Sequence, residues 1–209
     1  MTDIYQQRYL EHQKRKTLSL SSDFGISKFR KYNKKEQKLF FEILKNRNSQ
    51  RVFNDKLIDI SPILEAIKTA PSSCNRRAII YSIITDKDSK ELLSKLLVGG
   101  VRWIHKANTI ILLAADMIAY KSPNEKDFMP YLDAGVIIQT IYLTCEAMNY
   151  GCCYVNPNIR KENKKFFKKM FSVKDNWLFC GAIAIGKYDK KHKSFNNNSK
   201  DKRQERENI

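Results

Sequence analysis

The feature that most constrains the fold of this chain is an apolar segment over residues 134–149. Its hydrophobic side chains leave little polar surface on any side. A helix that is apolar all around is stable only when other elements surround it. We therefore predict a central helix here, ended by Gly151. The chain has 209 residues, which is enough for one medium-sized domain with a sizeable core or for two very small ones.

Short apolar segments bounded by polar residues predict the strands. Strands and helices alternate without a regular βαβ repeat, and no GxGxxG motif follows a strand. An α+β domain is therefore favoured over a doubly wound parallel sheet. Phe166, Phe167 and Met170 are expected to face inward from a basic helix. The predicted strands are residues 78–84, 109–114, 152–155 and 179–185, and further helices are predicted at 35–45, 61–70, 88–98 and 160–171.

The net charge of +17 raises the question of a nucleic-acid ligand. Residues 1–56 hold 14 Lys and Arg against 6 Asp and Glu, and residues 160–209 hold 15 against 6, whereas the middle of the chain is balanced. Such flanks attract polyanions without specificity. Aromatic residues do not alternate with the basic ones in a stacking pattern. A solvated, lysine-rich surface is therefore favoured over a dedicated nucleic-acid site.

Five cysteines, at positions 74, 145, 152, 153 and 180, are scattered along the chain. They form neither a CxxC motif nor a Cys/His cluster with metal-ligand spacing, so no metal site is predicted. We interpret them as reduced thiols that pack as small hydrophobic side chains, with Cys74 as the exception inside a polar motif. The N-terminus lacks a secretory signal, and no run approaches the roughly 20 apolar residues that cross a bilayer. We expect a cytoplasmic protein without membrane contact.

Two polar turns rich in arginine, hydroxyl and amide side chains flank a short predicted helix. The first covers residues 47–53 and the second residues 70–77. Arginine offers a planar, permanently charged fork that suits phosphate groups. Together the two turns predict a site for a phosphorylated cofactor, and an enzyme is the leading interpretation.

Five motifs occur in a fixed order between about residues 40 and 190. This order and spacing resemble the FMN-dependent nitroreductase-like flavoproteins. The matching residues are Arg47, Ser49, Arg51 and Phe53 (R-x-S-x-R-x-F), Ala70, Pro71, Ser72, Ser73 and Asn75 (A-P-S-S-x-N), Asp133, Gly135 and Gln139 (D-x-G-x-x-x-Q), Gly151, Cys153, Tyr154 and Asn156 (G-x-C-Y-x-N), and Ile185, Gly186 and Tyr188.

The resemblance assigns roles around FMN residue by residue. Arg47 and Ser49 would bind the phosphate with Asn48 nearby, and Arg51 would approach the N1/O2 edge, where positive charge stabilises the reduced flavin. Asn75, with Ser72 and Ser73, would bind the ribityl chain and the pyrimidine edge. Backbone amides near Asn156 and Asn158 would face N5 and O4. Asp133 and Gln139 are expected to fix helix packing.

The chain departs from the family pattern at three places. Arg77 stands where the family has a neutral glutamine, so it is a candidate for contact with the flavin or an acidic substrate. Pro157 has no N–H to donate, which leaves Asn156 or Asn158 for that role. Lys200 and Lys202 are the candidates for the late basic residues of the phosphate site.

The resemblance also implies a fold and an activity. The fold is α+β, with a mostly antiparallel central sheet flanked by helices, and it forms a homodimer with FMN at the interface. NAD(P)H would reduce FMN, which would then reduce a small electron-poor acceptor such as a nitroaromatic compound or a quinone. No catalytic side chain is required, because the flavin carries the hydride. The predicted parts are an N-terminal extension over 1–39, the FMN-binding domain over 40–189 and a polar tail over 190–209.

Two alternatives remain open from the sequence. The substitution at Arg77 and the basic flanks are compatible with a nucleic-acid-binding module on a degenerate form of the fold. A specialised flavin redox step in a biosynthetic pathway is the other alternative.

Overall fold

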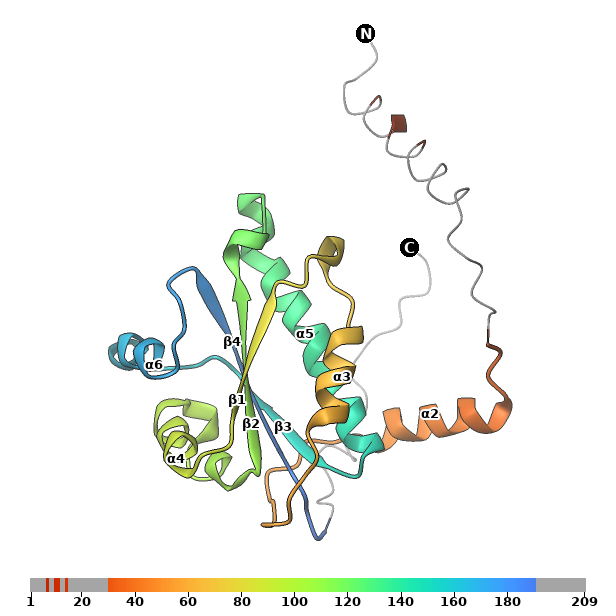
Figure 1. Ribbon diagram of the computed structural model, residues 1–209, viewed down its shortest axis with the longest axis horizontal. Coiled ribbons are helices and arrows are strands. Elements are labelled where there is room, and N and C mark those ends of the chain that lie inside the picture. The colour runs from red at the N-terminus through yellow and green to blue at the C-terminus, as the bar shows by residue number, and fades with distance from the viewer. Residues whose placement is uncertain (1–6, 8–9, 12–13, 15–29, 191–209) are drawn as a thin grey trace, which may run out of the picture. The chain divides into compact units, whose positions relative to one another are not determined.

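Four antiparallel strands form the sheet in the part of the chain that the structure describes, which covers residues 7, 10, 11, 14 and 30–190 of a computed structural model (Figure 1). All three strand pairings are antiparallel, and the order is β1-β2-β4-β3. The predicted α+β class with an antiparallel central sheet is thus confirmed. The strands are β1 (Ile79–Ile84), β2 (Thr109–Asp116), β3 (Gly151–Val155) and β4 (Trp177–Gly186).

The chain divides into two units, Met1–Phe40 and Phe41–Ile209. In the first unit, the side chain of Asn33 caps the start of α2 (Lys34–Asn46) by accepting hydrogen bonds from the next backbone amides. The predicted tail lies almost entirely outside the described residues. The predicted extension lies largely outside them too, so both stay predictions.

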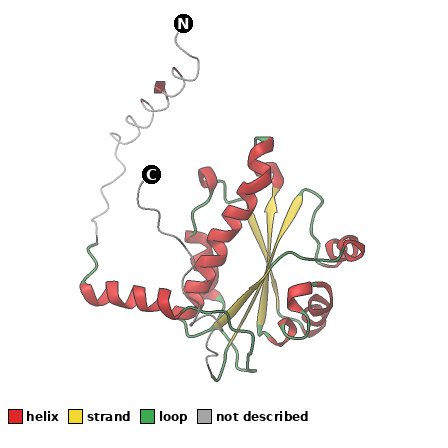
Figure 2. Ribbon diagram, turned by 180° about the vertical axis from the view of Figure 1, so that it is seen from behind, coloured by secondary structure: helices red, strands yellow, loops and turns green. Residues whose placement is uncertain are grey.

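In the second unit, helices cover both faces of the sheet (Figure 2). The pair α3 (Ser61–Thr69) and α5 (Pro123–Ala147) packs over one face, and α4 (Lys87–Leu96) and α6 (Lys164–Met170) pack over the other. Ile110 and Ile111 are neighbours in β2 but belong to the two different cores. Successive side chains of a strand point to opposite faces, so a strand covered on both sides is apolar throughout. Short 3-10 turns lie at Ser73–Asn75, Val98–Gly100, Ile104–Lys106, Met117–Ala119 and Lys161–Asn163.

The predicted helix is confirmed as α5, but it begins 11 residues earlier than predicted. Its surroundings also differ from the prediction, because other elements cover only one side of α5 in the described chain and leave Leu132 and Val136 exposed. Ser122 and Glu125 form a capping box, and Pro123 occupies the first turn, where its missing N–H costs nothing. The prediction that Gly151 ends this helix is wrong. Asn149 adopts the left-handed conformation after the helix, with φ of 54°, and Gly151 already belongs to β3.

The inward side of α6 is narrower than predicted. Phe167 is 1% exposed and packs against Phe171 and Phe179, with ring centroids 5.1 and 4.7 Å away. Phe166 and Met170 are about half exposed. A helix of 7 residues makes only two turns and contacts the sheet along one short row, so the prediction that all three side chains face inward is wrong.

All five cysteines are free thiols. Four of them are buried, and only Cys74 is exposed. This agrees with the interpretation of the buried ones as small hydrophobic side chains.

Candidate functional site

Residues 47–53, called the basic turn below, cover the outer edge of β3. The backbone N–H of Gln50 donates to the carbonyl of Cys152 at 2.9 Å, and the Gln50 side chain is buried. A Cβ on Gly151 would lie 2.8 Å from the Cβ of Gln50. The turn can therefore approach the strand this closely only because residue 151 is a glycine.

Tyr142 of α5 holds the basic turn from the other side. Its hydroxyl accepts from the backbone N–H of Tyr154 at 2.8 Å and lies 3.1 Å from the Ser49 hydroxyl. The Arg47 guanidinium lies over its ring, 5.1 Å from the centroid. Burial raises the pKa of Tyr142. The phenol thus remains a neutral anchor for Ser49 and Arg47.

Arg51 contacts Trp103, which belongs to the segment that packs beside the loop after β3. Its guanidinium lies 5.9 Å from the ring centroid of Trp103, and the indole N–H donates to the carbonyl of Gly99 at 2.8 Å. A Cβ on Gly99 would lie 3.8 Å from the side-chain oxygen of Asn156. The backbone of Asn158 is fixed in turn, because its carbonyl accepts from Val98 at 3.1 Å.

The two arginines of the basic turn keep their charge available. In the part of the chain that the structure describes, Arg47 and Arg51 lie over aromatic rings, and neither forms an ion pair with a carboxylate. Burial raises the pKa of the neighbouring Cys153 thiol, while Arg51 and Ser49 oppose that shift. Two guanidinium groups and a hydroxyl at one strand edge form a donor set for an anion. Asn48 lies within this set, and its side-chain oxygen accepts from Gln50 at 2.6 Å.

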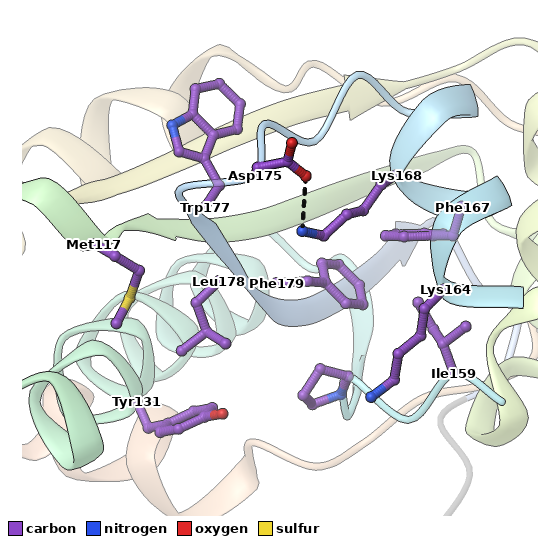
Figure 3. A pocket seen from close by; sticks show the side chains of 11 residues that line it. Met117, Tyr131, Ile159, Lys164, Phe167, Lys168, Asp175, Trp177, Leu178 and Phe179 are labelled. Carbon is purple, nitrogen blue, oxygen red and sulfur yellow. Dashed lines mark hydrogen bonds and ion pairs between the residues drawn. The ribbon is translucent and has the colours of Figure 1, made fainter. Parts of the chain in front are cut away.

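A pocket of about 380 Å³ lies beyond the same loop, between α5, β4 and α6 (Figure 3). Pro157, which stands between Asn156 and Asn158, is one of its lining residues. This volume lies within the range of small-molecule sites. The predicted flavin-facing loop therefore borders a cavity.

The second predicted turn is a loop over residues 71–77, called the strained loop below. Cys74, Asn75 and Arg77 all have positive φ, at 50°, 54° and 52°. Each such residue costs of order 1 kcal/mol and persists only where its surroundings enforce it. The loop uses its own side chains for this purpose. The Ser72 hydroxyl accepts from the Arg77 N–H at 2.9 Å, and the Arg77 guanidinium donates to the carbonyl of Lys68 at 2.7 Å.

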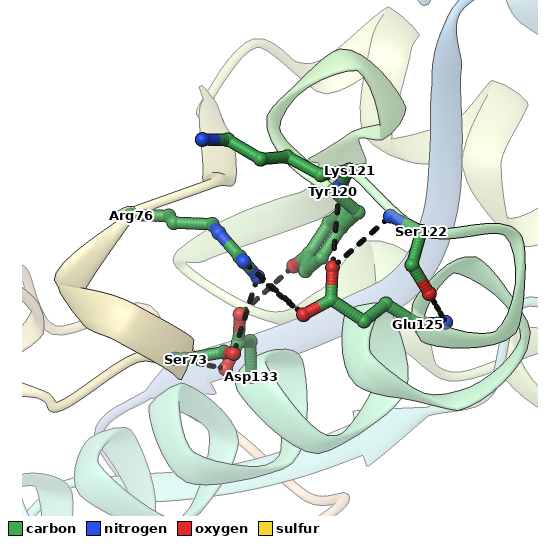
Figure 4. Close-up of polar contacts among 7 residues, drawn as sticks. All are labelled: Ser73, Arg76, Tyr120, Lys121, Ser122, Glu125 and Asp133. Carbon is green, nitrogen blue, oxygen red and sulfur yellow. Dashed lines mark hydrogen bonds and ion pairs between the residues drawn. The ribbon is translucent and has the colours of Figure 1, made fainter. Parts of the chain in front are cut away.

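Residues of α5 hold the strained loop from below (Figure 4). Asp133 is 4% exposed, and its carboxylate accepts from the Ser73 N–H at 2.8 Å and from the Tyr120 hydroxyl at 2.9 Å. Burial and this carboxylate raise the pKa of Tyr120. Arg76 donates two hydrogen bonds of 3.1 Å to Glu125. The loop is thereby clamped at both ends, while Asn75 stays exposed.

The structure brings the predicted residues together in two groups rather than one. Arg47, Asn48, Ser49 and Arg51 lie near the loop of Asn156 and Asn158, whereas Ser72, Ser73, Asn75 and Arg77 form the other group. Tyr142 anchors the first group and Asp133 holds the second, and these residues are nine positions apart on α5. At 1.5 Å per residue the anchors are about 13 Å apart along the helix. Lys200 and Lys202 lie outside the described residues.

Sequence patterns missed the positioning role of several residues. Tyr142 and Trp103 belong to none of the five motifs, whereas their polar atoms fix Ser49 and Gly99. A tyrosine hydroxyl on an otherwise apolar helix needs a partner when buried, and this was the available signal. The sequence Ser122-Pro-Asn-Glu125 likewise carried the signature of a helix start. No sequence signal pairs Arg76 with Glu125.

Comparisons with known proteins agree with this geometry. Residues 98–187 match the model of the nitroreductase family. An FMN reductase [NAD(P)H] of Bacillus subtilis (strain 168) is 28% identical in an alignment over 125 residues that covers 52% of this chain and 50% of that protein. The chain thus spans about half the length of this curated relative. The resemblance to nitroreductase-like flavoproteins is confirmed.

Solved structures show the same fold. An FMN-dependent nitroreductase from Clostridium difficile R20291 is 25% identical, with a TM-score of 0.67 over 81% of this chain and 99% of that chain. A nitroreductase family protein from Streptococcus pneumoniae TIGR4 is 19% identical, with a TM-score of 0.63 over 74% of this chain and 92% of that chain. The central sheet and its flanking helices therefore have the nitroreductase fold.

Proposed function

We propose that this chain, which has the nitroreductase fold, is a flavin-dependent oxidoreductase that binds FMN and uses NAD(P)H as electron donor. The observation that carries the proposal is the basic turn. It places Arg47, Ser49 and Arg51 at one strand edge, with both guanidinium groups free of carboxylates among the described residues. A phosphate group fits this donor set. When bound, FMN supplies the centre that accepts and donates hydride.

In this proposal the residues of the chain bind FMN and orient it. Arg47, Ser49 and Asn48 hold the phosphate, and Arg51 stabilises negative charge at the pyrimidine edge. Exposed Asn75 contacts the ribityl chain, with Ser72 and Ser73 beside it. The loop of Asn156 and Asn158 faces the opposite edge of the ring, and Lys200 and Lys202 stay candidates for the phosphate. For Arg77 we favour a role in fixing the loop, because its guanidinium already binds the end of α3.

We further propose that two chains share each cofactor. The anchors of the basic turn and the strained loop are about 13 Å apart along α5, so one chain holds the two groups at separate places. A symmetric dimer repeats both groups on each partner. In this arrangement the basic turn of one chain and the strained loop of its partner contact the same cofactor.

The visible absorption spectrum of the purified full chain tests the cofactor assignment. We expect a flavin spectrum that is bleached by NADPH or NADH under exclusion of oxygen. Arg51→Ala should retain less FMN and be reduced more slowly, whereas Lys87→Ala, which removes an exposed cation in the first turn of α4, should behave like the wild type. A colourless protein that does not bind added FMN would refute the proposal.

Subunit mixing tests the shared site. Arg47→Ala and Asn75→Ala chains are purified separately, unfolded, mixed in equal amounts and refolded. If two chains share each site, mixed dimers contain one intact site, and about a quarter of all sites recover full activity. If each site lies within one chain, every site stays damaged and no activity is regained.

The acceptor class follows from the resemblance alone. A small electron-poor compound, nitroaromatic or quinone-like, is the proposed acceptor. In the described part of the chain no helix has the length and apolar character needed to cross a membrane. The cytoplasmic location expected from the sequence stays a prediction.

A further inference from the structure

The pocket beside Pro157 combines aromatic walls with cationic side chains (Figure 3). Phe167 and Phe179 form one wall, with ring centroids 4.7 Å apart and ring planes inclined by 52°. Phe167 is 1% exposed, so it packs behind Phe179, which is the partly exposed ring of this wall. Trp177 and Tyr131 also line the cavity. Walls of this kind favour a planar aromatic ligand through stacking and edge-to-face contacts.

The charged side chains that line this pocket are those of two lysines and one aspartate, Asp175. Lys164 and Lys168 are four residues apart on α6, so they project from the same side of the helix, and both line the cavity. Lys168 lies 3.4 Å from Asp175, whose side chain is fully exposed. Among the described residues Lys164 has no ion pair. Residues 160–170 contain six basic residues and one acidic residue. Such a local excess attracts anions to the cavity.

We propose that this pocket binds the acceptor and selects aromatic compounds that carry a carboxylate. The ring lies against Phe179, which Phe167 supports from behind, and the carboxylate is bound by the ammonium group of Lys164 and, in place of Asp175, by that of Lys168. This inference rests on the proposed function, in which Asn156 and Asn158 face the flavin. Pro157 lies between these two residues, so the pocket that it lines then adjoins the flavin. It goes beyond that function by naming the substrate class.

A matched pair of acceptors tests the selection. 4-Nitrobenzoate and 4-nitrobenzamide have nearly the same size, but only the first is an anion. In the assay one NADPH and one proton reduce the nitro group to a nitroso group, and water and NADP⁺ are released. We expect kcat/KM of the FMN-loaded full chain to be roughly tenfold higher for the benzoate, chiefly through KM, because each lysine contributes a partly exposed ion pair.

Two double variants of α6 separate pocket binding from general attraction. Lys164→Gln/Lys168→Gln should abolish the preference for the benzoate, because kcat/KM for the benzoate falls to that for the benzamide. Lys165→Gln/Lys169→Gln removes the same charge from exposed lysines of the same helix that do not line the pocket, and it should keep the preference. The inference would be overturned if the wild type had the same kcat/KM for both acceptors. It would also be overturned if both double variants lost the preference for the benzoate to the same extent.

The same experiment keeps the two proposals distinguishable. Turnover of the benzamide without preference for the benzoate leaves the proposed function standing and refutes the pocket inference. If neither acceptor is reduced, calorimetric titration of the full chain with 4-nitrobenzoate decides. Binding that is lost in Lys164→Gln/Lys168→Gln and kept in Lys165→Gln/Lys169→Gln supports the inference, and absence of binding in the wild type refutes it.

Discussion

The basic turn and the strained loop differ in which groups they leave for a ligand. In the basic turn, backbone contacts and aromatic rings fix the segment, so the ends of Arg47 and Arg51 stay available. In the strained loop, Ser72, Arg76 and Arg77 are engaged inside the protein. The first segment therefore offers charge, and the second offers a fixed backbone with one exposed amide. Substitutions in the basic turn should therefore weaken FMN binding without changing the stability of the fold. Substitutions in the strained loop should lower both FMN affinity and stability.

The largest effect is expected at Asp133, which holds the strained loop. Asp133→Ala leaves the Ser73 N–H and the Tyr120 hydroxyl buried without their acceptor, at a cost of about 3 kcal/mol in the free energy of unfolding. FMN affinity should fall as well, because the loop loses its enforced conformation. Urea denaturation and flavin titration measure the two effects. Unchanged stability would show that the buried carboxylate does not clamp the loop.

The conservative variant at the same position separates positioning from simple packing. Asp133→Asn keeps the volume and one acceptor oxygen, so it should recover part of the stability and part of the FMN affinity. If Asp133→Asn regains stability but not affinity, the negative charge itself contributes to binding.

The next effect is expected at Gly151, where the basic turn approaches β3. A Cβ at this position meets Gln50 at 2.8 Å and the Tyr188 ring at 3.0 Å. Gly151→Ala should therefore cost about 2 kcal/mol of stability and weaken FMN binding by displacing the turn. Gly135→Ala is the control, because nothing lies within 4 Å of its added Cβ. Equal effects of the two substitutions would contradict a close approach at Gly151.

Arg47→Ala tests the claim that the basic turn offers charge. We expect FMN affinity to fall by about tenfold or more, since a charge-assisted hydrogen bond contributes about 1.5–3 kcal/mol. The unfolding free energy should change little, because the guanidinium has no ion pair among the described residues. Lys45→Ala, an exposed cation at the end of α2, controls for net charge. A large loss of stability in Arg47→Ala would remove the contrast between the two segments.

The smallest effect is expected at the Arg76–Glu125 pair. Both side chains are partly buried, at 17% and 26% exposure, whereas those of the Lys68–Glu65 pair are 62% and 70% exposed. Arg76→Gln should lower Tm by about 2–4 °C, and Lys68→Gln should lower it less. Equal shifts in thermal scans would indicate that burial adds nothing to the pair.

The pH dependence of the same pair follows from the pKa of Glu125. The backbone N–H of Ser122 and the guanidinium of Arg76 hold this pKa below its ordinary value. A carboxyl group of this kind stabilises the fold above its ordinary pKa and loses that contribution as the pH falls through the lowered value. The difference between wild type and Arg76→Gln should therefore be full at neutral pH and shrink in acid. A difference independent of pH would contradict the ion pair.

Much of the fold could be predicted because local patterns and tertiary packing agree. The apolar strands at 109–114 and 179–185 are central and covered on both faces, so their composition alone indicates them. The start of α5 differs from the prediction because its first turns precede the apolar segment and begin with the capping box of Ser122 and Glu125. Phe166 was misplaced because apolar spacing cannot tell how wide a contact the sheet offers.

The candidate site was predictable in its residues but not in its arrangement. Motif spacing indicates Arg47 and Asn75, yet no pattern in one chain says that their segments attach to different turns of α5. The roles of Tyr142 and Asp133 depend on which polar atoms meet across 60 residues or more of sequence. Such contacts are set by the packed structure rather than by local preference.

The contact of Gln50 and Tyr142 with β3 has a consequence for solubility. An unpaired outer strand is a template on which another chain can add its own strand. Here the carbonyl of Cys152 and the N–H of Tyr154 are already occupied. The basic turn, which is proposed to bind the cofactor, thereby also prevents another chain from adding a strand at the β3 edge of the sheet.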